Sequence, residues 1–387
     1  MSHPATPPNT TELESFVAYT LNASSIKNEL HNKANRGSIE EPLFPFTAWQ
    51  SLATHNLLHR FAPRLCTLPT PTTGLPCRDI ALTGYLMTRH HLSLGLTMTW
   101  IGQLLKVHFL RTLGCNDPAY IEAVLDGDSL CALAISEPGV GAHPKHLSCH
   151  AIKVGDDYII NGEKAFVSHG PYADRFIVLA ITEQAQSRKY FSAFLVPADS
   201  TGLQRMPPQL VKGLQPSSHC NIVFTDCQIP AAALIGTAGQ AFAEISLPMR
   251  TLEDSLMLAP IAGAMQAQLD YLAQTDASHN EPFDLQIMGE LLSLTESAKE
   301  LGIIAASKLD QHEDIPDLTP LIIGFRSLVQ QLQTVLLEFH DEYPGLRELA
   351  ADIQTLSNIG RQASAARTAS LAERFVADRL AEQQEKD

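Results

Sequence analysis

Residues 156–182 read DDYIINGEKAFVSHGPYADRFIVLAIT, and this run decides the fold of the middle of the chain. It holds two blocks of alternating or β-branched apolar residues, DYIINGEKAFV and RFIVLAIT, separated by turn residues, which is typical of β-strands. Four further runs of this kind lie between residues 130 and 236: LCALAIS, CHAIKVG, YFSAFLVPA and NIVFTDCQIP. The dipeptides Gly155-Asp156 and Asn161-Gly162 predict hairpin turns. We therefore predict an all-β module in the middle of the chain.

Both flanks of this module show the 3.6-residue period of helices. Upstream, apolar positions at helical spacing run from residue 11 to about 128, with a Pro/Thr/Gly-rich loop, LPTPTTGLPC, at 68–77. Downstream, the same period predicts four helices, near 242–273, 284–310, 318–340 and 346–383. Runs of one element type followed by runs of the other indicate an α+β or multi-domain chain rather than a doubly wound sheet.

The predicted architecture is an α+β multi-domain chain with three parts. Residues 1–128 form an N-terminal helical domain whose first twelve residues are a disordered lead. Residues 129–237 form a small β-barrel or β-sandwich, and residues 238–387 form a C-terminal four-helix bundle. We expect a ligand site where the β-module meets the helices. No G-x-G-x-x-G motif follows a first strand and no P-loop is present, so a nucleotide, if bound, is not held by either of these motifs.

Composition excludes several classes of protein. The 387 residues carry a formal net charge of −15, which argues against nucleic-acid binding because phosphates would be repelled on average. Apolar content of 45% and charged content of 18% exclude a disordered chain. No apolar run of about 18 residues predicts a membrane span, and the N-terminus lacks the basic and apolar regions of a signal peptide.

Cysteine and histidine usage predicts neither disulfides nor a metal site. The seven cysteines are odd in number and none forms a C-x-x-C pair, so we expect reduced thiols and a cytoplasmic location. The spacing of His143, His146 and His150 would suit one face of a helix, but Pro144 and the strand-like run that follows argue against a helix there.

Three segments in this order resemble the signatures of the flavin-dependent acyl-CoA dehydrogenases. LAISEPGVGAH (133–143) is similar to Y-x-x-T-E-P-x-x-G-S-D, and DDYIINGEKAFVSHGPYADRFIVLA (156–180) is similar to the family's hairpin and W-I-T/S-N-G loop. KGLQPSSHCNIVFTDCQIPAAALIG (212–236) resembles a third family segment, K-x-G-x-R-x-S followed by V-P-x-x-x-L-x-G. The resemblance is strong across residues 116–272 and weaker outside them. It implies the family's three-part fold, FAD as cofactor and α,β-dehydrogenation of acyl-CoA or a related thioester.

The same resemblance implies a set of cofactor contacts. Ser136 and the backbone amides near Ile135 would face the flavin pyrimidine edge, where N–H and O–H donors stabilise developing negative charge. Gly141 allows close backbone approach, and Ala142 replaces a family serine that contacts a phosphate or the acyl-CoA. Phe166 stands where the family has a tryptophan packed on the flavin, and Ser168 matches a hydroxyl that reaches the N5 region. The alternatives are an ordinary turn at 136–141 and plain core packing for Phe166.

The resemblance also implies a catalytic base. Removal of a proton next to a thioester carbonyl needs a carboxylate in a desolvated site. Most family members carry this glutamate near the C-terminus, and a minority carry it in the first bundle helix within L-E-R. Leu252-Glu253 matches the second location, whereas Gly360 falls at or next to the first. The minority pattern therefore predicts Glu253 as the base, and the alternative is a solvated first-turn glutamate favoured by the helix dipole.

The cofactor motifs of the C-terminal part are degenerate. The family's R-x-x-F-G is replaced by TDASHNEPF, and its Q-x-x-G-G-x-G by TVLLEFHDEYP. Three functions follow: an acyl-CoA dehydrogenase-like oxidoreductase, a non-catalytic relative that serves as a subunit or interaction module with weak or no FAD binding, or a flavin oxidase or monooxygenase on the same fold. For the first, the resemblance implies fatty acid metabolism, a homodimer or homotetramer, and an electron-transfer flavoprotein as acceptor.

Overall fold

The computed structural model describes residues 10–23, 44–62, 74–90, 93–186, 188–209, 213–276, 283–312, 314–343, 345–359 and 361–384. The first part is helical, as predicted, within these ranges. Its elements are α1 (Thr10–Ala23), α3 (Phe46–Thr54), the 3-10 turn η2 (His59–Phe61), α4 (Cys77–Arg89), α5 (Leu94–Thr112) and α6 (Pro118–Leu125).

Two of these helices begin at side chains that cap them. Ser93 accepts a hydrogen bond from the amide of Leu96 at the start of α5, and Asp117 accepts one from the amide of Tyr120 at the start of α6. The prediction of a disordered lead over residues 1–12 is wrong at its end, because α1 begins at Thr10 and buries Leu13 and Val17. Residues 1–9 lie outside the described part.

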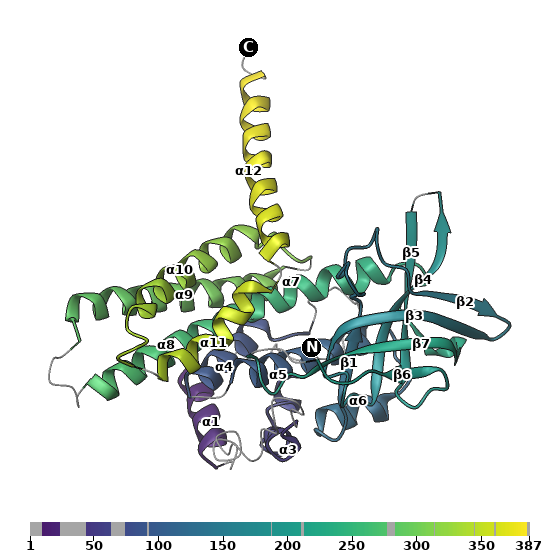
Figure 1. The fold of residues 1–387 in the computed structure, drawn as a ribbon, viewed down its shortest axis with the longest axis horizontal. Coiled ribbons are helices and arrows are strands. Elements are labelled where there is room, and N and C mark those ends of the chain that lie inside the picture. Colours follow the sequence, from purple (N-terminus) through teal and green to yellow (C-terminus); the bar gives the residue numbers. More distant parts are fainter. Residues whose placement is uncertain are drawn as a thin grey trace, which may run out of the picture.

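The middle of the chain is an eight-stranded sheet, as the alternating runs predicted (Figure 1). The order β6-β7-β3-β2-β4-β5-β8 places β3 beside β7, while β1 pairs in parallel with β4 off this path. Two short strands, β6 and β8, were not predicted from the sequence. The strands are β1 (Cys131–Ala134), β2 (His150–Val154), β3 (Asp157–Ser168), β4 (Arg175–Ala185), β5 (Arg188–Pro197), β6 (Leu203–Arg205), β7 (His219–Pro230) and β8 (Leu234–Ile235).

One of the two predicted hairpin turns is confirmed. Gly155-Asp156 joins β2 to β3, with Gly155 at φ +61°. Asn161-Gly162 was wrongly predicted as a turn, because both residues lie inside β3 at a register shift opposite β7. Gly162 is needed for close approach, since an added Cβ would lie 2.7 Å from the Cα of Cys149.

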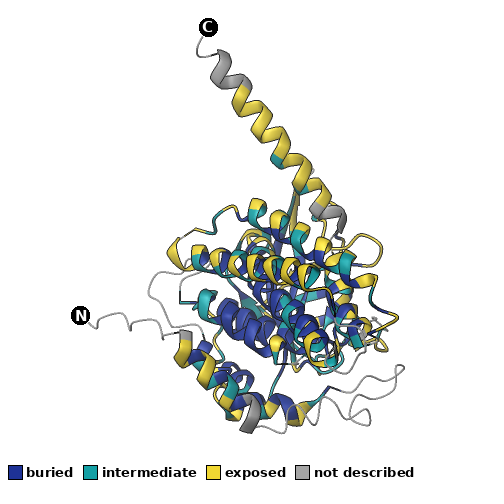
Figure 2. Ribbon diagram, turned by 90° about the vertical axis from the view of Figure 1, so that its left-hand side faces the viewer, coloured by how far each residue is buried: buried dark blue, intermediate teal, exposed yellow. Residues whose placement is uncertain are grey.

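The last part is helical, beginning with a π-helical turn, η4 (Phe242–Ser246). The helix predicted over 346–383 is wrong, because α11 ends at Asn358 and a separate helix, α12, begins at Arg361. Helix α12 projects from the body of the protein, and most of its described surface is exposed (Figures 1 and 2). The helices are α7 (Leu247–Leu256), α8 (Leu258–Asp276), α9 (Leu285–Gln311), α10 (Thr319–Leu337), α11 (Gly345–Asn358) and α12 (Arg361–Gln384).

Helices from both ends of the chain share one core. Helix α4 packs closely on α8 because glycines stand at their crossing: a Cβ on Gly263 would lie 2.2 Å from both the Thr88 hydroxyl oxygen and the Tyr85 carbonyl oxygen. The Thr88 hydroxyl donates to the carbonyl of Pro260 at 2.7 Å. Figure 2 shows buried helical segments at the centre of the molecule. Within the described ranges, no helix combines the length and the apolar character that a membrane span requires.

The sheet is joined to this core through α5. Gln103 on α5 donates to the carbonyl of Cys131 and accepts from its amide, both at 3.0 Å. A second contact runs between Thr99 on α5 and His169 just after β3, at 2.8 Å between hydroxyl and ring nitrogen. These buried bonds fix the ends of β1 and β3 against the helices, and the candidate site lies at that junction.

Candidate active site

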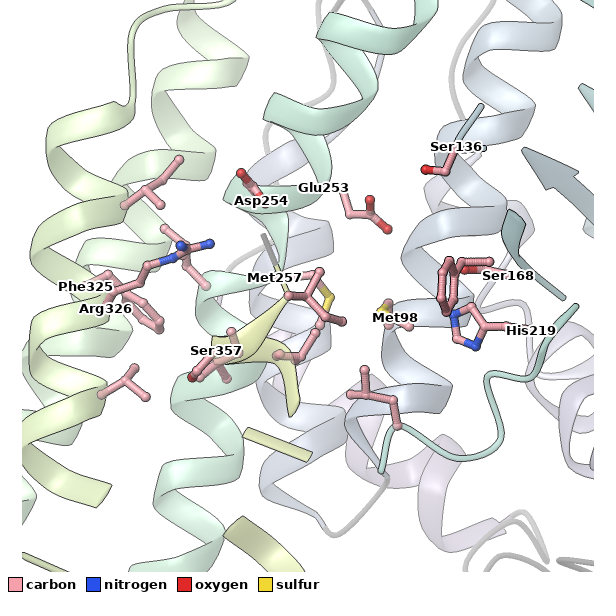
Figure 3. A pocket seen from close by; sticks show the side chains of 18 residues that line it. Met98, Ser136, Ser168, His219, Glu253, Asp254, Met257, Phe325, Arg326 and Ser357 are labelled. Atoms are coloured by element: carbon pink, nitrogen blue, oxygen red, sulfur yellow. The ribbon is translucent and has the colours of Figure 1, made fainter. Parts of the chain in front are cut away.

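A cavity of about 620 Å³ lies between the sheet and the helical core (Figure 3). Its wall is mostly apolar and comes from elements far apart in the sequence, which is typical of small-molecule sites. The lining residues are Met98, Ser136, Phe166, Ser168, Leu214, His219, Glu253, Asp254, Met257, Leu258, Ile261, Ile322, Phe325, Arg326, Val329, Leu356, Ser357 and Ile359.

Three of the predicted cofactor contacts meet on the sheet side of this cavity. Ser136 follows β1, and Phe166 and Ser168 lie at the end of β3. Neither serine hydroxyl has a hydrogen-bond partner among the described residues, so both are available to a ligand. Figure 3 shows Ser136 and Ser168 on the same side of the cavity, across from the α10 residues Phe325 and Arg326.

A buried ion pair supports this wall. The Lys164 ammonium donates to the Glu137 carboxylate at 2.9 Å and to the Ile135 carbonyl at 3.0 Å. The amide of Ala165 donates to the Ser136 carbonyl at 2.8 Å. Strand β3 is therefore tied to the turn after β1, and the spacing of Ser136 and Phe166 is set by backbone and buried side chains.

Phe166 has an unusual conformation for an aromatic residue. Its φ is +53°, in the left-handed region that favours glycine, and its side chain is 61% exposed. Plain core packing, the alternative reading of Phe166, does not fit a ring that is so exposed. A bulky residue held in this region carries backbone strain, which accumulates at functional sites. The ring therefore offers an open aromatic face at the cavity.

Glu253 reaches the cavity from α7, on the helical side (Figure 3). Burial raises the pKa of its carboxyl above the ordinary value, the Lys106 ammonium opposes this change, and Asp254 adds to it. The next residue, Asp254, accepts a hydrogen bond of 2.9 Å from Arg367 on α12. The cavity thus holds one carboxyl that is engaged with an arginine and one with a raised pKa that faces the cavity.

The remaining predicted residues lie outside this cavity. Ile135 is half-buried and contributes its carbonyl to Lys164. Gly141 and Ala142 are exposed, in a turn closed by a 3.0 Å bond from the amide of Glu137 to the carbonyl of Gly141. Gly360 lies outside the described residues, although its neighbour Ile359 lines the cavity.

Several residues that line the cavity were not predicted from the sequence. His219 has a buried Nδ1 without a hydrogen-bond partner in the described part of the chain, and burial lowers the pKa of its ring. It directly follows Ser217-Ser218 in a segment already singled out, which was a usable signal. Met98 and Arg326 sit in ordinary helical patterns, and nothing in the sequence marks them as lining a cavity.

The arrangement suits a planar ligand with polar edges on the sheet side and a substrate between that ligand and Glu253. Free hydroxyls, a partnerless ring nitrogen and an exposed phenyl face match such a ring system. A carboxyl whose pKa is raised by burial in a mostly apolar wall is suited to take a proton from a weak carbon acid.

Comparison with known proteins finds sequence similarity in the middle of the chain and a shared fold over nearly all of it. Residues 132–227 match the family model described as acyl-CoA dehydrogenase, middle domain. The chain is 33% identical over 195 residues to the short-chain specific acyl-CoA dehydrogenase of Rattus norvegicus mitochondria, an alignment covering 50% of this chain and 44% of that enzyme. The chain thus spans less than half the length of that relative.

The fold is shared over nearly the whole chain with solved structures. An FAD complex of PigA superposes with a TM-score of 0.77 at 19% identity, covering 97% of this chain and 99% of that one. The prolyl acyl carrier protein oxidase AnaB superposes with a TM-score of 0.76 at 19% identity, and the alignment covers 96% of this chain and 100% of that one. These likenesses show a shared fold, while the middle-domain match and the rat enzyme show that part of the chain is similar in sequence to acyl-CoA dehydrogenases.

Proposed function

We propose that this protein is an FAD-dependent oxidoreductase that introduces a double bond between the α and β carbons of an acyl thioester. One observation carries the proposal: Glu253 from α7 and the trio Ser136, Phe166 and Ser168 from the sheet line one cavity. The family supplies the class of reaction, and the cavity supplies groups suited to both halves of it.

The residues of the sheet side fit the flavin ring. Phe166 would pack its open face on the ring, and the hydroxyls of Ser136 and Ser168 would hydrogen-bond its polar edge. His219 adds a ring nitrogen that has no partner among the described residues. When bound, FAD supplies the acceptor for the hydride that leaves the β carbon.

Glu253 takes the α proton in this proposal. The electron pair of the α C–H bond becomes the new α,β double bond as the hydride leaves the β carbon, so protons and electrons balance. Burial in a mostly apolar wall raises the pKa of the carboxyl, which makes its ionised form a stronger base. Asp254 is less suited to the role of base because its carboxylate forms an ion pair with Arg367.

The substrate class is a thioester, whose carbonyl acidifies the α proton. The rat relative is named for short-chain acyl-CoA, and AnaB for a prolyl group on an acyl carrier protein, so the carrier of the thioester is open to test. Transfer of electrons to an electron-transfer flavoprotein and assembly into a homodimer or homotetramer belong to the same proposal.

The test begins with the visible spectrum of the purified protein and a titration with FAD. We then expect Glu253→Gln to retain FAD and to lose thioester-dependent flavin reduction by about 10³-fold or more, as removal of a general base does. Glu290→Gln, an exposed glutamate on α9, is the matched control and should reduce flavin normally. Normal reduction by the Glu253 variant would refute the assignment of the base.

A second candidate, the non-catalytic relative, is favoured by one region of the chain. The segment TVLLEFHDEYP holds acidic residues where the family carries glycines, and Asp341 and Glu342 are exposed there. Carboxylates would repel a pyrophosphate. A colourless protein that takes up no FAD would support this candidate over the enzyme.

A further inference from the structure

The cavity wall carries one arginine that the proposed chemistry does not use. Arg326 lines the cavity from α10 and is half-buried. None of the described residues forms a hydrogen bond or an ion pair with its guanidinium group. A guanidinium withdrawn from water without a counter-charge loses hydration that nothing replaces. A ligand that fills the cavity is therefore in a position to supply the partner.

The carboxylate that shares this part of the wall is already engaged. Asp254 lines the cavity from α7 and accepts a hydrogen bond of 2.9 Å from Arg367 on α12. A further arginine of α12, Arg374, is likewise paired, with Asp317 at 3.0 Å. Among the described residues that line the cavity, Arg326 is the one lysine or arginine, and it stays without a counter-charge.

Two further arginines stand close to this part of the wall. Arg367 reaches it through its ion pair with Asp254, and Arg250 lies one turn before Asp254 on the same face of α7. Burial lowers the pKa of Arg250, the guanidinium groups of Arg367 and Arg326 lower it as well, and Asp254 opposes them. Three arginines thus gather around one carboxylate, in a chain whose formal net charge is −15. An anionic ligand would be attracted to this place.

Arg326 and the proposed base lie at different places in the cavity. Figure 3 shows the Glu253 carboxyl on the side of Ser136 and Ser168, whereas Arg326 lies on the far side, with Asp254. The other residues that α8 and α10 contribute to the wall are apolar. A substrate whose reacting carbons lie beside Glu253 therefore reaches Arg326 only with another part of the molecule.

We infer that Arg326 is the anion-binding residue of this cavity and that the thioester substrate carries a carboxylate or a phosphate that pairs with it. The inference rests on the proposed function, because it names the class of thioester that the proposed site would take. The planar fork of a guanidinium group matches two oxygens of either anion. A carboxylate would end the acyl chain, whereas a phosphate would belong to the carrier arm of coenzyme A or of an acyl carrier protein.

Binding of four unsaturated thioesters distinguishes these two sources without any turnover. They are the hex-2-enoyl and hex-2-enedioyl esters of coenzyme A and of N-acetylcysteamine, so that the acyl carboxylate and the arm phosphate are each present or absent. Their Kd values are measured by isothermal titration calorimetry on the purified protein supplied with FAD. We expect Arg326→Leu to raise the Kd by about 10-fold to 100-fold, for both hex-2-enedioyl esters if the carboxylate is the partner and for both coenzyme A esters if the phosphate is.

Two variants serve as controls for this measurement. Arg326→Lys keeps the charge without the planar fork and should raise the Kd less than Arg326→Leu does. Arg188→Leu removes the same charge from an exposed position on β5 that does not line the cavity, and should leave every Kd unchanged.

The uncharged ester, hex-2-enoyl-N-acetylcysteamine, separates anion binding from a structural role of Arg326. A Kd that rises equally for this ester and the three charged ones would overturn the inference, and so would four unchanged Kd values. If the Kd of the charged esters depends on Arg326 but no saturated thioester reduces the flavin, the proposed function fails while the anion site stands.

Discussion

Lys164 donates a hydrogen bond of 2.9 Å to Glu137, and both side chains are buried. Glu137 also accepts from the amides of Ser148 and Cys149, at 2.7 and 2.9 Å. The carboxylate is therefore fully engaged, and the pair joins the turn after β1 to strand β3. Because Ser136 precedes one partner and Phe166 lies two residues after the other, this ion pair holds the sheet side of the cavity together.

Breaking this pair should be strongly destabilising. Glu137→Gln leaves the Lys164 ammonium buried without a counter-charge, so we expect a loss of about 3–5 kcal/mol in the free energy of unfolding, measured by urea denaturation. Glu137→Gln combined with Lys164→Met should recover part of the loss, because no charge then stays buried. A single variant as stable as the wild type would contradict the structural role of the pair.

The same pair should make the protein sensitive to acid. Burial alone would raise the pKa of Glu137, but Lys164 and the amides of Cys149 and Ser148 hold it below the usual value. A lowered pKa in the folded state contributes stability that is complete above the unfolded-state pKa of about 4.3 and is lost as the pH falls through the folded-state value. Thermal unfolding between pH 6 and 3 should show this loss in the wild type and a shallower one in Glu137→Gln.

Glu253 should have the opposite effect on stability. Its pKa is raised, chiefly by burial, so between about pH 4.3 and its folded-state pKa the folded protein binds more protons than the unfolded chain. This group therefore makes stability fall as the pH rises through that window. We expect the Tm of Glu253→Gln, relative to the Tm of the wild type, to rise as the pH increases from 4.5 to 8. If the difference between the two Tm values is the same at every pH, Glu253 is not desolvated in the folded protein.

Phe166 should matter for flavin and little for folding. Phe166→Ala removes the open aromatic face, so the Kd for FAD should rise about twofold to tenfold, measured by fluorescence titration. Phe166→Trp restores a larger ring and should bind at least as tightly as the wild type. Tyr19→Ala, which removes a 71% exposed ring on α1, is the matched control and should leave the Kd unchanged.

Gly95 should tolerate no side chain, because α5 touches the wall loop of the cavity there. A Cβ at Gly95 would lie 1.9 Å from the carbonyl oxygen of Leu214, a cavity residue. Gly95→Ala should cost about 1–3 kcal/mol or more in unfolding free energy and weaken ligand binding. Gly289→Ala on α9 meets nothing within 4 Å and should instead stabilise by about 0.5–1 kcal/mol, as a helix-interior glycine replacement does.

The sequence by itself determined the order and type of the main elements. Alternating or β-branched apolar runs over 156–182 predicted β3 and β4, because strand propensity and burial pattern are local properties of the chain. The joint order of three motifs predicted the family, and those motifs named Ser136, Phe166, Ser168 and Glu253, which the fold brings to one cavity. Their contacts with FAD and the role of Glu253 as base stay predictions.

Only the tertiary structure decided the rest, because those features depend on atoms far apart in the sequence. Asn161-Gly162 has the residues of a turn, yet close approach to Cys149 requires the glycine inside a strand. Glu253 on α7 and Ser136 after β1 line one cavity only because the helical core packs against the sheet. Periodicity reveals which face of an element is buried, whereas the identity of the groups that meet there is set by packing between elements.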